Sequence, residues 1–360
     1  MIAVVIRDTP YLKILQPIIE EFIKQNIPYI LYHYDAPRGE KEYLRASKIN
    51  IEKSSKLITS KATKVVAFDS DKQLFKWLLS DQITKLVSIE IYLWAKGYLT
   101  ELKKAGIKLY SLLYLSDSLW QDNPDCIQAM NKVYYTTSYL KNTQLDFLNI
   151  PAVYSRDQVC GCPIFDTLAN KPSSGDKVLV LLPNLREEHV KTAFGSKDNF
   201  VKIIEHLAKD AKLIYKTRKK QWLPKEILPF ATEVITDSDK MYPSIVADLF
   251  RKTHTTVMFY SSGIYEAVYA GNYVVNIPFS LNRWNWDKNK MKDYFSNETG
   301  HLYNFGGVVE SVEQSKILSG EWKLTNKLDP ILRKAWVEKF IGSVPINSAR
   351  VIATDIIRDK

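Results

Sequence analysis

The segment from Thr255 to Pro278 contains the residues whose types and order are best suited to chemistry. A β-rich apolar run ends there in Ser261-Ser262-Gly263 and continues directly into a helical pattern that contains Glu266. A helix start binds anions because its first backbone N–H groups lack partners, and serine hydroxyls and glycine suit the approach of a phosphate. The segment therefore predicts a phosphate site, with Glu266 one turn into the helix and within reach of a ribose diol.

An ordinary helix start explains the same residues. Serine is a common helix cap, and a carboxylate in the first turn is favoured by the helix dipole. The short motif does not separate capping from phosphate binding, so the rest of the chain has to be considered.

Strand and helix patterns alternate along the chain, which predicts parallel sheets built from right-handed βαβ units. Strands are expected at 2–6, 29–34, 64–69, 85–90 and 108–117, and again at 177–182, 212–217, 232–237, 255–260 and 273–278. Helices are expected at 11–27, 74–80, 99–106, 199–209, 245–251, 264–270 and 347–360. Gly106 is placed to end one of these helices.

The length and composition indicate a globular protein of two domains. A chain of 360 residues exceeds what one hydrophobic core usually supports, and its 46% hydrophobic and 25% charged residues are ordinary globular usage. The stretch 164–177 gathers Pro, Ser, Gly and charged residues, as exposed linkers do. We expect domains at 1–165 and 177–345, a linker at 166–176 and a C-terminal helix at 346–360.

The charge and the cysteines restrict the partners and the compartment. Fifty Lys and Arg against forty Asp and Glu give a net charge of +10, spread along the chain, which favours a nucleotide diphosphate, an anionic membrane surface, an acidic glycan or nucleic acid. Three cysteines do not make a disulfide framework. With no signal-peptide pattern and no apolar run near ~18 residues, the sequence predicts a cytoplasmic protein, with peripheral contact to an anionic membrane left open.

Two motifs carry a resemblance to a known group of proteins. SSGIYEAVYAGNYVVNIP resembles the nucleotide-binding strand-helix-strand of GT-B proteins, especially the group of CDP-glycerol glycerophosphotransferases and UDP-N-acetylglucosamine 2-epimerases. The matching residues are Ser261, Ser262, Gly263, Glu266, Ala267, Gly271 and Pro278. VCGCPIFDTL at 159–168, which we call the handover motif, is similar to the Gly-x-Pro-x-x-Asp-x-Leu signature found where the first domain of these proteins passes into the second. The matching residues are Gly161, Pro163, Asp166 and Leu168. Cys162 stands where Asn is usual, which leaves the subfamily open.

The resemblance implies an α/β fold of two Rossmann-like doubly wound domains that face a central cleft. The first domain would take the acceptor and the second a nucleotide-sugar. Residues that the resemblance places at the nucleotide, besides the serine motif, are Asn184, Lys216, Arg218, Tyr242 and Pro243. Lys216 would meet the diphosphate as a point charge and Arg218 through two hydrogen bonds.

The reaction implied is transfer of a sugar from a nucleotide-diphosphate donor, UDP-linked or related, to a glycan, lipid-linked or polymer acceptor. No metal or other cofactor is expected, and the five histidines show no metal-ligand spacing. An inverting transferase needs a general base on the acceptor side. Asp8 and Asp117 are the first candidates for that base, and Asp35, His33 and Glu90 also stand at apparent strand ends, although a lone carboxylate there is often a helix cap.

Three other functions fit the same sequence. A polyol-phosphate transferase would use a CDP-alditol in a similar cleft, and a UDP-sugar 2-epimerase would need no acceptor. A non-catalytic protein would bind nucleic acid or a glycan through the same basic residues, with a steep dependence on salt.

Overall fold

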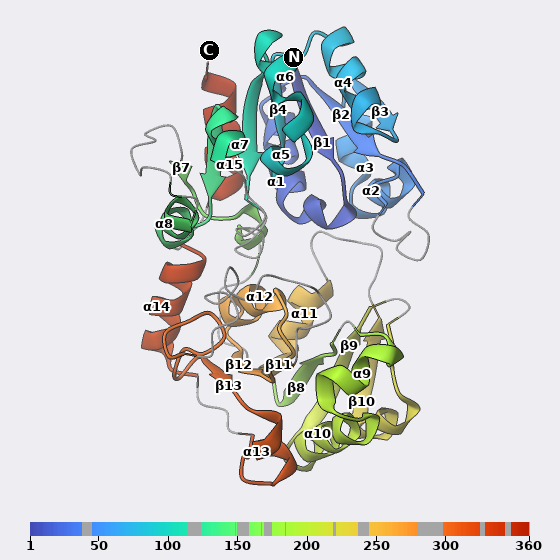
Figure 1. Ribbon diagram of the computed structural model, residues 1–360, viewed down its shortest axis with the longest axis vertical. Coiled ribbons are helices and arrows are strands. Elements are labelled where there is room, and N and C mark those ends of the chain that lie inside the picture. Colours follow the sequence, from blue (N-terminus) through green and yellow to red (C-terminus); the bar gives the residue numbers. More distant parts are fainter. Residues whose placement is uncertain are drawn as a thin grey trace. The chain divides into compact units, whose positions relative to one another are not determined.

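The computed structural model describes residues 1–37, 45–113, 124–147, 149, 158–166, 168, 175–183, 185–218, 221–236, 245–279, 298–324, 328–342 and 347–359. The chain divides into two compact units (Figure 1). Unit 1 consists chiefly of Met1–Thr167 and Glu338–Lys360, and unit 2 of Leu168–Ser238 and Ile245–Val337. Each unit is described by itself.

Among the described residues, unit 1 contains a seven-stranded parallel sheet in the order β3-β2-β1-β4-β5-β6-β7. The strands are β1 Ile2–Ile6, β2 Tyr29–Tyr34, β3 Lys64–Phe68, β4 Lys85–Ile89, β5 Lys108–Leu112, β6 Lys132–Tyr135 and β7 Gln158–Val159. The helices are α1 Leu12–Lys24, α2 Lys48–Ser54, α3 Lys56–Ser60, α4 Asp71–Ser80, α5 Ile91–Trp94, α6 Leu99–Lys104, α7 Pro124–Ala129, α8 Ser138–Phe147 and α15 Ser348–Arg358. The strand order reverses between β1 and β4.

Unit 2 has the same architecture in its described part, with a six-stranded parallel sheet in the order β10-β9-β8-β11-β12-β13. The strands are β8 Lys177–Leu181, β9 Lys212–Thr217, β10 Ala231–Thr236, β11 Thr253–Met258, β12 Tyr273–Asn276 and β13 Val309–Ser311. The helices are α9 Glu187–Phe194, α10 Lys197–Asp210, α11 Ile245–Lys252, α12 Gly263–Tyr269, α13 Gln314–Leu318 and α14 Pro330–Phe340, whose end enters unit 1. Here the order reverses between β8 and β11.

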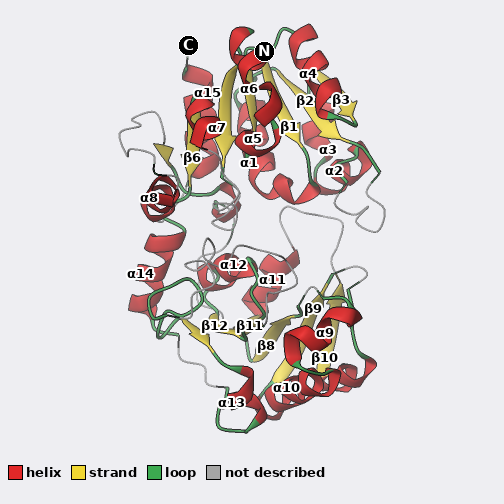
Figure 2. Ribbon diagram, in the orientation of Figure 1, coloured by secondary structure: helices red, strands yellow, loops and turns green. Residues whose placement is uncertain are grey.

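The strands form because their apolar residues are buried on both faces of each sheet. Every residue of β1 is at most 6% exposed, and the four residues of β12 are all buried. Such continuous apolar runs are typical of parallel sheets covered by helices on both sides, as Figure 2 shows. The predicted fold class, two doubly wound α/β units, is therefore confirmed.

The handover motif has a structural role inside unit 1. Asp166 accepts hydrogen bonds from the backbone N–H groups of Ser348 at 3.0 Å and Ala349 at 2.8 Å, the first two residues of α15. Burial raises the pKa of the Asp166 carboxyl, and these two N–H groups oppose that rise. Gly161 has a φ of +78°, which glycine adopts without strain. The motif thus fixes the N-terminus of the C-terminal helix.

The other end of α15 is attached to the first residues of neighbouring strands. Asp355 pairs with Lys132 at 2.7 Å, and Asp359 pairs with Lys108 at 2.9 Å. Lys85 donates to the carbonyl of Ile356 at 2.6 Å. Helix α15 therefore lies against the edge of the sheet at which β4, β5 and β6 begin, and it also packs against α1.

Candidate functional site

The turn between β11 and α12 contains the serine motif, and a buried asparagine holds that turn. Tyr260 has a φ of +48°, which is uncommon for a residue other than glycine. Its backbone N–H donates to Oδ1 of Asn276 at 2.9 Å, and Nδ2 of Asn276 donates to Oγ of Ser311 at 3.0 Å. Asn276 is fully buried at the end of β12. It positions a strained turn at the place where such strain often marks function.

The two serines have different surroundings. Oγ of Ser261 accepts a hydrogen bond from the backbone N–H of Gly263 at 3.2 Å, so this hydroxyl caps the helix start. The Ser262 hydroxyl is half-buried and makes no hydrogen bond to the residues that the structure describes. Capping thus accounts for Ser261, and Ser262 is the serine available to a ligand.

Gly263 is required for a close contact inside unit 2. A Cβ added there would lie 2.8 Å from Cδ1 of Leu181, the last residue of β8, and 3.3 Å from Oγ of Ser261. Glycine therefore lets the start of α12 approach β8. The contact with the Leu181 side chain accounts for a glycine at position 263 without a ligand. Glu266, in the first turn of α12, is only 8% exposed.

Lys216 and Arg218 lie at the end of β9. Lys216 is 7% exposed, and its Nζ donates to the carbonyl of Thr217 at 3.1 Å. Arg218 is exposed, and its guanidinium has no partner in the described part of the chain. Holding an ammonium group in so buried a position is unfavourable unless an anion or hydrogen bonds compensate it.

The sheet register brings Lys216 and the serine turn to one edge. Leu181 of β8 is paired with Lys216 on one side and with Met258 on the other. Two strand spacings therefore separate Lys216 from the end of β11, about 10 Å between backbones. We call this edge, at which Leu181, Thr217, Met258 and Asn276 end their strands, the carboxyl edge of unit 2. Ligands of doubly wound sheets bind at such an edge, beside the point where the strand order reverses.

Gln221 joins two loops at this edge, a role that the sequence analysis missed. Its Oε1 accepts from the backbone N–H of Arg218 at 2.8 Å, and its Nε2 donates to the carbonyl of Pro183. Gln221 thereby connects the loop after β9 to the loop after β8. Asn184 follows Pro183 directly but lies outside the described residues, as do Tyr242 and Pro243.

Replacing Asn276 by alanine is expected to lower the free energy of unfolding by about 2–3 kcal/mol, because the Tyr260 N–H loses its buried acceptor. Ser311→Ala is the matched control, since it removes the other partner of Asn276 but keeps the bond to Tyr260. Urea unfolding of both variants checks this, and equal free energies of unfolding for Asn276→Ala and the wild type would contradict it.

At the corresponding edge of unit 1, two carboxylates follow the strands beside the reversal point. Asp8 comes after β1, in the position before the short 3-10 turn Thr9–Tyr11. Glu90 follows β4 directly, is 7% exposed and has a φ of +49°. Its N–H donates to the carbonyl of Leu112 at 2.9 Å. Glu90 and Tyr260 thus both have a positive φ just after the strand on one side of the reversal point of their unit.

The remaining acceptor-side candidates have other surroundings. His33 on β2 is 3% exposed, and burial lowers its pKa, with Asp35 opposing that effect. Asp35 pairs with Nε of Arg45 at 2.7 Å. Asp117 lies outside the described residues. Of these candidates, Asp8 and Glu90 flank the reversal point.

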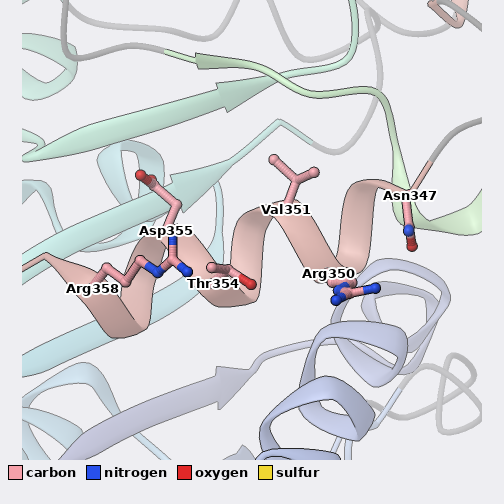
Figure 3. A pocket seen from close by; sticks show the side chains of 6 residues that line it. All are labelled: Asn347, Arg350, Val351, Thr354, Asp355 and Arg358. Carbon is pink, nitrogen blue, oxygen red and sulfur yellow. The ribbon is translucent and has the colours of Figure 1, made fainter.

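A surface hollow of about 430 Å³ lies along α15 (Figure 3). Its lining residues share one side of that helix: Asn347, Arg350, Val351, Thr354, Asp355 and Arg358. Helix α15 lies against the beginnings of strands, whereas doubly wound sheets bind ligands at the strand ends. The hollow is therefore separate from the candidate site. Within the described ranges, no three His, Cys, Asp or Glu side chains gather as a metal site would, and no helix is long and apolar enough to cross a membrane.

Comparisons with known proteins report on the fold. A scan against protein-family models finds no match, and a search of curated proteins finds none. Among solved structures, UDP-GlcNAc 2-epimerase from Methanocaldococcus jannaschii is similar with a TM-score of 0.60 and 14% identity over 99% of each chain.

Two further structures are similar at the same identity. UDP-GlcNAc 2-epimerase from Neisseria meningitidis, bound to UDP-GlcNAc, has a TM-score of 0.55 and 14% identity over 99% of this chain and 98% of the other. A variant of the wall teichoic acid polymerase TagF has a TM-score of 0.55 and 14% identity over 99% of this chain and 88% of the other. These similarities extend over both units, and the chain accordingly has the GT-B fold.

Proposed function

We propose that this protein is an enzyme that binds a nucleotide-diphosphate sugar at the carboxyl edge of unit 2 and transfers the sugar to an acceptor. The observation that carries the proposal is Lys216, a buried ammonium group two strand spacings from the turn that presents Ser262. A diphosphate between them would receive a positive charge from one side and a hydroxyl from the other. The exposed Arg218 adds a cation at the same edge.

Such an arrangement suits the departure of a nucleotide diphosphate. Negative charge develops on the diphosphate as the bond to the sugar breaks, and fixed cations and donors stabilise that charge most where water is excluded. Lys216 is held within the sheet, and Gln221 fixes the loop of Arg218 by a hydrogen bond to its backbone N–H. These groups therefore need little reorganisation as charge develops on the diphosphate. These groups would serve without a metal, and metal independence stays a prediction.

The acceptor hydroxyl needs a base, and we assign it to the carboxyl edge of unit 1. Asp8 and Glu90 flank the reversal point there, and Asp117 remains a candidate from sequence alone. Glu90 has the stronger support, because it is largely buried and sits in a strained conformation that the fold maintains. A buried carboxylate is suited to accept a proton as transfer proceeds.

A second candidate function is epimerisation of a UDP-sugar. Its support is that the similar structures include UDP-GlcNAc 2-epimerases that match this chain along its whole length. The similarity to TagF keeps a CDP-alditol donor in consideration as well. An epimerase needs no acceptor, whereas both transferases do, so the two classes differ in the second substrate.

The proposal predicts thermal stabilisation by nucleotides. At a concentration one hundred times Kd, a ligand that binds only the folded state stabilises it by about 2.7 kcal/mol, which raises Tm by roughly 5 °C for a chain of this size. We expect UDP or UDP-sugars, and less so CDP and CDP-alditols, to give this shift at millimolar concentration. A panel in which no nucleotide shifts Tm would contradict the proposal.

Product analysis then separates the candidates. A sugar transferase releases nucleotide diphosphate only when an acceptor is added. A polyol-phosphate transferase transfers the alditol together with one phosphate and releases CMP, again only with an acceptor. An epimerase converts the UDP-sugar with no acceptor present. A protein that binds nucleotides equally well after Lys216→Met, with a steep dependence on salt, would instead be a non-catalytic binder of polyanions.

A further inference from the structure

Two consecutive short helices of unit 1 present the same pattern of side chains to solvent. In each, a lysine is followed directly by an aliphatic residue, and a second lysine stands four residues after the aliphatic one. These residues are Lys48, Ile49 and Lys53 in α2, and Lys56, Leu57 and Lys61 at α3. Ile49 and Lys53 are four residues apart, as are Leu57 and Lys61, so each of these pairs shares one side of its helix. Lys48 and Lys56 flank the pairs and are also exposed. We call these six residues the α2–α3 face, and Figure 1 shows the two helices beside β2 and β3.

The aliphatic residues of this face are unusually accessible. Ile49 is 70% exposed and Leu57 is 44% exposed, while Ile51 and Ile58 of the same helices are fully buried. The helices are firmly placed, because α3 packs against α1 and the Tyr29 hydroxyl donates to the carbonyl of Ile58 at 2.6 Å. Ile49 and Leu57 therefore project from a rigid part of the unit.

The surroundings of the face are strongly basic. The stretch from Arg45 to Lys64 contains six basic residues and one acidic residue. Arg45 pairs with Asp35 at 2.7 Å and Lys64 with Asp81 at 2.8 Å, so the excess positive charge lies on the four lysines of the face. The acidic residue, Glu52, is engaged locally: it lies 3.8 Å from Nζ of Lys48 and accepts from Oγ1 of Thr59 at 2.9 Å. Lys48, Lys53, Lys56 and Lys61 are spaced three to five residues apart, and all four are exposed on two helices that contact each other.

We infer that the α2–α3 face binds the surface of an anionic lipid bilayer. Lysines near such a surface are attracted to the headgroup phosphates, and aliphatic side chains between them enter the boundary with the acyl chains. Nucleic acid is the other polyanion to consider, but its grooves and bases are read by hydrogen-bonding and aromatic side chains. Ile49 and Leu57 have no such role, so the combination with lysine favours lipid. This inference does not depend on the proposed function.

Vesicle co-sedimentation of the full chain tests the inference. One set of vesicles is phosphatidylcholine alone, and in the other part of it is replaced by phosphatidylglycerol. The wild type should sediment only with the second set, and added salt should release it. Replacing Lys48, Lys53, Lys56 and Lys61 together by glutamine should reduce the partition coefficient by almost three orders of magnitude, at about fivefold per lysine.

The aliphatic residues have a separate test. Ile49→Ser with Leu57→Ser should weaken binding about tenfold while leaving the charge unchanged. Matched controls lie on unit 2: Lys202→Gln with Lys209→Gln changes exposed lysines, and Ile331→Ser with Leu318→Ser changes exposed aliphatics. All the substituted side chains are exposed, so Tm should stay close to that of the wild type.

The α2–α3 variants should lose vesicle binding while the controls keep it. No sedimentation of the wild type with anionic vesicles would overturn the inference, as would equal sedimentation of wild type and α2–α3 variants. Binding of an RNA or DNA duplex that depends on the four lysines, with no binding to vesicles, would overturn it in favour of a nucleic-acid surface.

Discussion

Lys216→Met should weaken UDP binding and slow turnover by about 100-fold or more. The lysine is buried at the carboxyl edge of unit 2, where a contact with the diphosphate would be poorly screened by water. Removing one such preorganised group typically lowers the rate 10²–10³-fold. Methionine keeps the length of the side chain and removes only the charge and the donor. Isothermal titration with UDP and steady-state kinetics with the UDP-sugar measure the two effects.

The matched control is Lys209→Met, an exposed lysine on α10 of the same unit. It should bind UDP as the wild type does. The free energy of unfolding of Lys216→Met should not fall, because a buried methionine replaces a buried ammonium group. Wild-type UDP affinity in Lys216→Met would show that the nucleotide binds elsewhere.

Asp166→Ala should lower the free energy of unfolding by about 2–3 kcal/mol. The substitution removes the acceptor of two backbone N–H groups at the start of α15, at residues 348 and 349, which are fully and nearly fully buried. Loss of a helix cap typically destabilises by ~1 kcal/mol, and a buried donor without a partner adds about 1–3 kcal/mol. Asp166→Asn keeps one acceptor oxygen and should lie between the alanine variant and the wild type.

Guanidinium chloride unfolding of these variants is compared with Asp176→Ala. Asp176 is exposed, and its ion pair with Lys212 is long at 3.8 Å, so Asp176→Ala should lower the free energy of unfolding by less than ~0.5 kcal/mol. Equal destabilisation by Asp166→Ala and Asp176→Ala would contradict the capping role. The handover motif would then need another explanation.

Much of the fold follows from the sequence because central strands such as β1 and β8 are largely continuous apolar runs. The prediction for 2–6 coincides with β1, and Gly106 ends α6 with a φ of +73°. The prediction at 108–117 is longer than β5, which ends at Leu112. Short strands were missed: β13 has three residues and is a strand because it pairs with β12. Such elements depend on tertiary pairing more than on their own pattern.

The candidate site was predictable only where its residues are close together in sequence. The serine motif and Lys216 lie at strand ends, as the alternation implied. Asn276 and Gln221 were missed because each acts across the fold, on Tyr260 sixteen residues earlier and on Pro183 thirty-eight residues earlier. Their signal in the sequence is only a polar residue beside a buried strand or in a loop.

The most direct test of nucleotide-sugar binding in unit 2 is a crystal structure of the protein soaked with a mixture of UDP-sugars and CDP-alditols. We predict diphosphate density at the carboxyl edge of unit 2, within hydrogen-bond distance of Nζ of Lys216 and Oγ of Ser262. Nucleotide density bound only away from that edge, for example in the hollow along α15, would contradict the proposal.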